Sequence, residues 1–355
     1  MKNREIFIKS NPRPICIGTG LVALDVVING DSEKSPKLST GGSCGNVLIA
    51  LSYLGWNSYP IARLGDDAAA VEILKDLKSW NVNTSLILQN NSSSTPIIIE
   101  KIGTNRNGAP WHRFEWVCPN CGSYLPKYKP VLVKDVEFIC NNMPFSQVFY
   151  FDRVSRSSIE LAKINKSRGA IIVFEPSGIQ DEKLFIECIQ VSDVVKYSNE
   201  RLSHIQELTQ EANITLEIET MGSEGLRYRL ANIKTWKVLT PYSVENLKDS
   251  AGAGDWCTAG IIHLIGRNGR KGFEGTCEEE IVNSLRLGQA LGAFTCCYEG
   301  ARGSMYSISK EEFQSKIYNI MNGTVSASIE DTESNVTKQA LKCVCPFCTK
   351  KEQNK

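Results

Sequence analysis

Short runs of consecutive apolar residues alternate along the chain with longer segments whose apolar residues recur every three or four positions. The runs in "PICIGTG", "SYPIARLGDD", "SQVFYFDRV", "GAIIVFEPSG" and "VSDVVKYSN" predict buried strands. The segments "NVLIALSYLGW", "AAAVEILKDLKSWNV", "SSIELAKINKS" and "DEKLFIECIQ" have helical spacing. This alternation predicts an α/β fold with a mainly parallel sheet covered by helices on both faces. Such sheets bind ligands beyond the carboxyl ends of their strands.

One region, residues 95 to 117, breaks the alternation. Its sequence, "TPIIIEKIGTNRNGAPWHRFEWV", is typical of two antiparallel strands joined by a turn rich in Asn and Gly. A hairpin inserted in a parallel α/β fold is often an appendage over the active site, so we expect a lid here. His112 and Arg113 are expected on a solvated face of this lid rather than as ligands. Its aromatic residues, Trp111 and Phe114, could stack on a nucleobase.

Composition narrows the class of protein. The chain has 355 residues, of which 42% are hydrophobic and 22% charged, as in an ordinary folded protein that can bury a large core. The formal net charge of +1 argues against a nucleic-acid partner. No apolar run approaches the ~18 to 20 residues that span a bilayer, and "MKNREIFIKSNPRP" lacks the features of a signal peptide. We therefore expect a cytoplasmic protein without a membrane partner.

The most informative stretch is "DSAGAGDWCTAGIIHLI", which begins at Asp249. Gly252, Ala253 and Gly254 have small or absent side chains and precede a helical segment, so their backbone N–H groups can approach an anion at a helix N-terminus. A carboxylate at Asp255 would repel that anion. Its position is explained if Asp255 accepts the proton of a hydroxyl group that attacks a phosphoryl group. A glycine-rich turn with an Asp cap is the alternative.

This stretch resembles the C-terminal signature of the ribokinase/PfkB carbohydrate kinase family, with Ser250 where Thr is usual. The family's other signature is similar to "GGSCGNVLIALSYLGWNSYPIARLGDD", and "GTGLVALDVVI" resembles its first strand and substrate-facing acid. The resemblance covers roughly residues 13 to 310. It implies a ribokinase-like three-layer α/β fold, with a central sheet of eight or so mostly parallel strands and a small β lid.

The resemblance also implies a reaction and its residues. The γ-phosphate of ATP would pass to a hydroxyl group, usually a sugar hydroxymethyl, with Asp255 as base and the amides of residues 252 to 254 as anion hole. The acceptor would contact Asp25, Gly41, Gly42 and Asn46. The residues implied on the nucleotide side are Lys196, Ser198, Thr220, Gly222, Gly225, Gly300 and Ala301.

This sequence matches the family's metal-binding residues less completely than its substrate-binding residues. In place of the usual Asn-x-x-Glu motif, which helps to organise Mg²⁺, the chain has Ser198 and Arg201, and Glu200 could substitute for the acid. Asp249 could contribute to a potassium site. Besides an active sugar kinase, the sequence leaves open a nucleoside kinase and a catalytically weak protein that binds a ligand or regulates.

Two cysteine pairs, "CPNC" at Cys118 and Cys121 and "CPFC" at Cys345 and Cys348, have the spacing of zinc knuckles. A reducing compartment disfavours disulfides, and independent surface pairs are the alternative. We predict that the four thiolates bind one structural Zn²⁺, either within one chain or between the subunits of a homodimer, with Cys343 as a substitute ligand. A zinc ribbon that recruits another macromolecule is a further function class.

These features predict the domain organisation. An N-terminal extension (1–12) precedes a kinase domain (13–320) that contains the lid hairpin and a knuckle insertion (118–130). A polar linker (321–342) then leads to a C-terminal knuckle (343–355).

Overall fold

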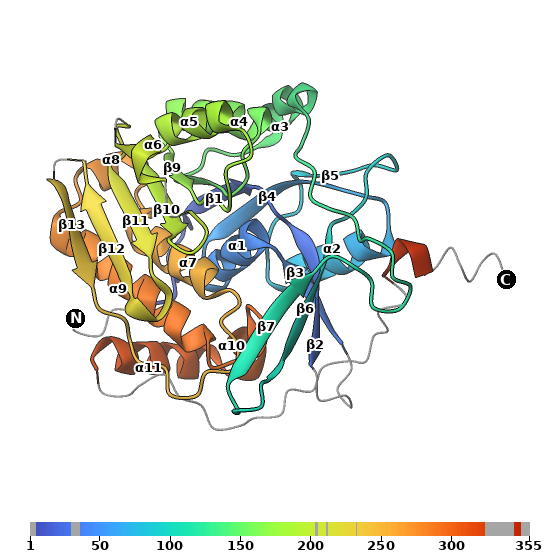
Figure 1. Cartoon of the computed structure of the whole chain (residues 1–355). Coiled ribbons are helices and arrows are strands. Elements are labelled where there is room, and N and C mark those ends of the chain that lie inside the picture. Colours follow the sequence, from blue (N-terminus) through green and yellow to red (C-terminus); the bar gives the residue numbers. More distant parts are fainter. Residues whose placement is uncertain are drawn as a thin grey trace.

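The computed structural model describes residues 5–29, 36–202, 205–210, 212–231, 233–323 and 344–348. Its strands form a nine-stranded central sheet and a four-stranded lid sheet (Figure 1). The central order is β13 (Ile233–Leu239), β12 (Leu226–Leu230), β11 (Leu216–Thr220), β10 (Val194–Ser198), β9 (Ile171–Phe174), β8 (Val148–Phe151), β1 (Ile15–Thr19), β4 (Asn57–Leu64) and β5 (Ile87–Gln89). All its neighbouring pairs are parallel except the two that involve β12.

Helices cover the central sheet on both faces because its strands are apolar on both. In β8, for example, Val148 and Tyr150 belong to one buried apolar cluster, and Phe149 and Phe151 to the other. The helices of the first cluster are α1 (Ser43–Tyr53), α2 (Ala68–Ser79), α7 (Ala253–Ile265), α8 (Gly269–Glu274), α9 (Glu278–Thr295), α10 (Gly303–Ser307) and α11 (Lys310–Met321). Those of the second face are α3 (Val136–Asn142), α4 (Arg156–Ser167), α5 (Glu182–Val191) and α6 (Gln206–Thr209), and short 3₁₀ turns cover Val133–Asp135 and Gly222–Glu224.

The lid sheet has the order β3 (Lys37–Gly41), β2 (Ala23–Asn29), β6 (Ile97–Thr104) and β7 (Pro110–Glu115). The antiparallel pair β6–β7 confirms the predicted hairpin. The segment "GTGLVALDVVI" differs from the expected single first strand, since it crosses from β1 of the central sheet into β2 of the lid. The chain can change sheets there because Gly20 has no side chain; a Cβ atom on it would lie 1.5 Å from Asp152 Oδ1.

The predicted α/β architecture, with a mostly parallel central sheet between helices and a small β lid, is confirmed. Within the described residues, no helix is long and apolar enough to cross a membrane. Part of the expected N-terminal extension packs on the domain: Ile6 is buried, and the ring of Phe7 contacts Tyr53 and Phe313. Most of the predicted linker (324–342) and Cys343 lie outside the described residues.

Candidate active site

The loop before α7 has a backbone that glycine alone accommodates easily. Gly252 has a φ of +75°, and a Cβ atom on it would lie 2.5 Å from the Cβ of Ala301. Its carbonyl accepts from the N–H of Trp256 and so starts the helix. The N–H of Ala253 donates to Ser250 O at 3.2 Å. The first turn of α7 presents further amides without intrahelical acceptors, where partial positive charge favours an anion.

Asp255 lies in that first turn and meets the other predicted signature. Asn46, on α1, donates from Nδ2 to Asp255 Oδ2 at 2.8 Å, although 209 residues separate the two along the chain. Burial raises the pKa of Asp255 to about 7, the carboxylate of Glu175 adds to the increase, and Asn46 and Lys196 oppose it. A carboxylate with this pKa can take up a proton near neutral pH.

Beneath the first turn of α7, Glu175 links several elements. It accepts hydrogen bonds from Lys196 Nζ (2.6 Å), Thr258 Oγ1 (2.7 Å) and Tyr150 OH (3.0 Å). Lys196 also donates to the carbonyl oxygen of Gly254 at 3.2 Å, and only 3% of its side chain is exposed. Lys196 was predicted on the nucleotide side, and the structure places it under the anion-hole loop. Sequence reasoning missed Glu175, although an acid directly after a buried strand was a usable signal.

On the acceptor side, the lid strand β2 brings Asp25 against Gly41. A Cβ atom at Gly41 would lie 1.7 Å from Asp25 Oδ2, so only glycine leaves room for the carboxylate. Burial raises the pKa of Asp25 to about 7, against a lowering by Arg302 and by the amide of Gly42. Among the described residues, the buried Oδ1 atoms of Asp25 and Asn46 have no hydrogen-bond partner. Such acceptor atoms suit the hydroxyl groups of a ligand.

The lid touches the anion-hole loop through His112. Its Nδ1 lies 3.2 Å from Asp249 Oδ1 and 3.4 Å from Ser250 Oγ. The expectation that His112 lies on a solvated face is therefore wrong, because its side chain pairs with a buried acid across the site. The neighbouring Arg113 does lie in solvent, with 75% of its side chain exposed. Since alternate residues of a strand face opposite sides, Phe114 shares the face of His112, and Trp111 faces away.

Asp249 organises the same loop. Its carboxylate accepts from the amides of Ala251 and Gly300, each at 2.9 Å, in addition to its contact with His112. Burial alone would raise the pKa of Asp249, but these hydrogen bonds hold it below its ordinary value. Burial and the nearby carboxylates of Asp249 and Asp25 raise the pKa of Glu100, on β6. The site therefore contains a buried acidic cluster beneath the lid.

Arg302 fastens the lid sheet to the rest of the molecule. It pairs with Asp76 at 2.8 Å and donates to the carbonyl of Thr40, whose amide in turn donates to Asp76 at 2.7 Å. Its side chain is 2% exposed. Sequence reasoning missed this residue because its partners come from α2 and β3, more than 220 positions away.

The remaining residues predicted for the nucleotide lie in two groups. Gly300 and Ala301 pack on the anion-hole loop, where the carbonyl of Ala301 accepts from Trp256 Nε1 at 3.0 Å. The others lie at or beyond the carboxyl ends of β10 and β11; they are Ser198, Thr220, Gly222 and Gly225. Glu200 extends to this second group, since its Oε1 would lie 3.7 Å from a Cβ atom on Gly222.

The four knuckle cysteines converge outside this site, and the structure brings all of them together within one chain.

Comparison with known proteins finds relatives both by sequence and by fold. The profile of the pfkB family carbohydrate kinases matches residues 16–108. A fructokinase of Vibrio alginolyticus is 24% identical over 275 residues, which are 70% of this chain and 83% of the relative. The fold superposes on that of an ATP-bound fructokinase from Xylella fastidiosa with a TM-score of 0.65, 17% identity and coverage of 87% and 98% of the two chains. It superposes on aminoimidazole riboside kinase from Salmonella enterica with a TM-score of 0.64, 17% identity and coverage of 85% and 99%.

The fold is thus that of the ribokinase-like kinases. Residues 16–108 are similar to the pfkB family carbohydrate kinases, most of the chain is similar to a fructokinase, and the predicted enzyme class, a carbohydrate kinase, is confirmed.

Proposed function

We propose that the protein transfers the γ-phosphate of ATP to a hydroxyl group of a sugar or sugar-like acceptor. The contact between Asn46 and Asp255 carries this proposal, because it joins the predicted acceptor-binding signature to the predicted base. The unpaired buried oxygens of Asp25 and Asn46 support a polyhydroxylated acceptor.

In the proposed reaction, the acceptor hydroxyl lies beside the hydrogen-bonded pair of Asn46 and Asp255. Asp255 takes its proton as the hydroxyl oxygen forms a bond to the γ-phosphorus and the bond to the β-phosphate oxygen breaks, which releases ADP. The amides at the start of α7 bind the oxygens of the transferring phosphoryl group. Glu175 and Lys196 position this turn through the carbonyl of Gly254 and the hydroxyl of Thr258.

We assign ATP to the region at the carboxyl ends of β10 and β11 and the loop at Gly300. A Mg²⁺ ion bound with the nucleotide would neutralise charge on its phosphates. Oxygen donors for its water shell are present there: the carboxylate of Glu200 lies beside Gly222, and the buried Oδ1 of Asn199 has no partner among the described residues. These donors suit Mg²⁺, which is a hard cation that prefers oxygen ligands and usually keeps several bound waters.

A potassium site at Asp249 fits less well. Oδ1 of Asp249 already accepts from Ala251 and faces His112, and Oδ2 accepts from Gly300. A cation would compete with a protonated His112 for the same oxygen, so we derive no step that requires potassium.

A nucleoside is the second candidate acceptor, and one observation favours it. The ring of Phe114 shares the face of the lid that His112 turns toward the anion-hole loop, where a base could stack on it. Trp111 cannot contribute to such a stack in this arrangement, because it faces the opposite side.

The experiment that distinguishes these candidates measures ADP release with a panel of free pentoses and hexoses and with the nucleosides of the same pentose. We expect the largest kcat/KM with a free sugar. Faster turnover of a nucleoside would favour the second candidate. Thermal stabilisation by a sugar without ADP release above the acceptor-free rate would instead indicate a binding protein and contradict the proposal.

A further inference from the structure

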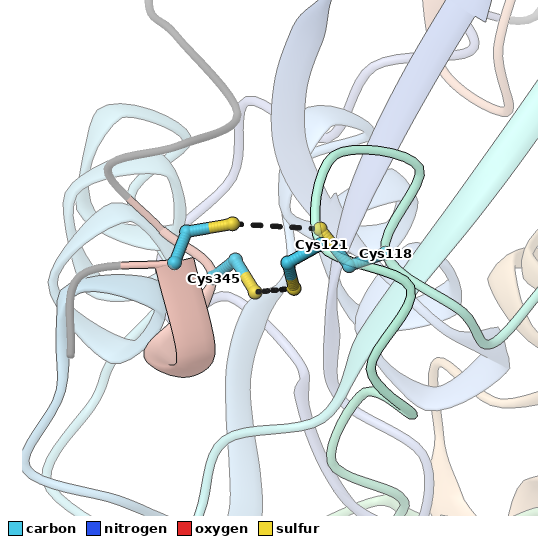
Figure 2. A group of neighbouring side chains, drawn as sticks. Cys118, Cys121 and Cys345 are labelled. Carbon is cyan, nitrogen blue, oxygen red and sulfur yellow. Dashed lines mark hydrogen bonds between the residues drawn. The ribbon is translucent and has the colours of Figure 1, made fainter. Parts of the chain in front are cut away.

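We propose that Cys118, Cys121, Cys345 and Cys348 form a structural zinc site that fastens residues 344–348 to the base of the lid. The first two cysteines follow β7, and the other two come from the C-terminal segment (Figure 2). All four sulfur atoms lie within 4.8 Å of one another. This inference is independent of the proposed phosphotransfer.

The spacing of the sulfurs is that of a tetrahedral metal site. Cys118 Sγ lies 3.8 Å from Cys348 Sγ, and Cys121 Sγ lies 3.8 Å from Cys345 Sγ. A tetrahedron with Zn–S bonds of about 2.3 Å has edges of about 3.8 Å. A disulfide instead requires a separation of about 2.05 Å. Both of these contacts join the two knuckles, so the four atoms form one cluster rather than two independent pairs.

The backbone around each pair is arranged to support thiolates. In the first knuckle, Gly122 adopts a φ of +71° and donates to Cys118 O at 2.9 Å, which turns the amide of Ser123 toward Cys121 Sγ. In the second, the amide of Cys348 donates to Cys345 O at 3.2 Å, and the amides of Phe347 and Cys348 favour the thiolate form of Cys345. Amide donors to sulfur stabilise the negative charge that a metal ligand carries.

The burial of the cysteine cluster favours a bound metal ion. Cys118, Cys345 and Cys348 are 1%, 0% and 8% exposed, and they belong to the main apolar core together with Val344 and Leu125. Four thiolates in such surroundings would repel one another strongly. On binding, the four thiols release four protons to solvent and each sulfur forms one bond to Zn²⁺, so the occupied site has a charge of −2 rather than the −4 of four thiolates without a metal. No oxidant or reductant is needed.

The site lies where it can stabilise the lid. The amide of Cys118 donates to Ser123 O, and that of Leu125 donates to Trp116 O, each at 2.9 Å, so the knuckle folds back on the end of β7. Pro126 O then accepts from Ile97, the first residue of β6, at 3.2 Å. Both ends of the lid hairpin therefore depend on this turn. The hairpin carries Glu100 and His112, and loss of the metal should loosen it.

The first test is the metal content of the full-length protein, purified without added metal or chelator. We expect about one Zn²⁺ per chain, the stoichiometry of a four-thiolate site. Cys118→Ser and Cys348→Ser should each lose most of it. Cys277→Ser is the matched control: Cys277 is exposed at the N-terminus of α9, where serine also caps a helix, and this variant should keep its zinc.

The second test does not depend on the folding of a variant. Wild-type protein, stripped of metal and reconstituted with Co²⁺, should show the visible absorption of tetrahedral thiolate-bound cobalt. Hydrogen exchange at residues 97–125 and 344–348 should be slower with the metal than without it. Wild-type protein that contains no metal, that contains iron in place of zinc, or that contains Cys118–Cys348 and Cys121–Cys345 disulfides would overturn the proposal.

Discussion

The start of α7 and the base of the lid are stabilised in different ways. At the start of α7, glycine geometry and a buried hydrogen-bond network around Glu175 fix the backbone, and every partner belongs to the central sheet or to a helix packed on it. At the base of the lid, the turn after β7 meets a separate C-terminal segment through four sulfur atoms. The first region is stabilised by the core, whereas in our proposal the second is stabilised by a bound metal ion.

This difference suggests that the two regions have different functions. A phosphoryl-transfer site must hold its amides and its base in fixed positions before the substrates arrive. A lid must instead admit the acceptor and then exclude water. His112 connects the two regions, because it is a lid residue whose side chain contacts the acid of the anion-hole loop.

The largest expected effect is at the rigid region. Asp255→Asn removes the base and preserves the shape of the side chain, and turnover should fall by about 10² to 10⁴, the usual contribution of a general base. ATP affinity, measured by calorimetry, should be nearly unchanged. Turnover close to that of the wild type would contradict the role of Asp255.

Gly252→Ala should lower kcat by about 10²-fold, comparable to the loss of one oxyanion donor. The added methyl group would meet Ala301 at 2.5 Å in a backbone conformation that L-residues rarely adopt. Gly254→Ala is the control. Its Cβ atom would have ordinary contacts of 3.9 Å, so its kcat should change much less. Equal losses in the two variants would show that the shape of the loop is not the cause.

The pH dependence of kcat/KM also tests the role of Asp255 as the base. Because Asp255 must be deprotonated and its pKa is raised to about 7, activity should be low at acidic pH and should increase as the pH rises through about 7. An unperturbed Asp, with a pKa of about 3.9, would give a flat profile between about pH 5.5 and 8. The acidic limb should disappear in Asp255→Asn.

The smallest expected effect is at the lid. His112→Gln should raise the acceptor KM about fivefold, since a hydrogen bond contributes on the order of 1 kcal/mol, with a smaller change in kcat. Arg113→Gln, at the exposed neighbouring position, should have no effect. The hydrogen bond to Asp249 raises the pKa of His112, so the stabilising contact is present at low pH and is lost as pH rises through this raised pKa. An unchanged acceptor KM in His112→Gln would mean that the contact does not help the lid to close.

How far the sequence could predict these regions depends on the distance between partners. The anion-hole loop was predictable because its glycines, its acid and the following helix are adjacent in the chain. The crossing from β1 to the lid was not, because "VALDVVI" is apolar in either sheet. Glu175, Arg302 and the contact of His112 depend on side chains that meet only in the folded protein. The cysteines are an exception, since repeated spacing identified partners 230 residues apart.

The most direct test of the account follows the transferred group itself. Wild-type protein is incubated with γ-labelled ATP and the best acceptor of the panel, and the products are separated and examined by phosphorus NMR. The account predicts a labelled phosphomonoester on an acceptor hydroxyl, formed in equal amount to ADP and nearly absent with Asp255→Asn. Label found only in inorganic phosphate would contradict transfer to an acceptor bound beside Asn46 and Asp255.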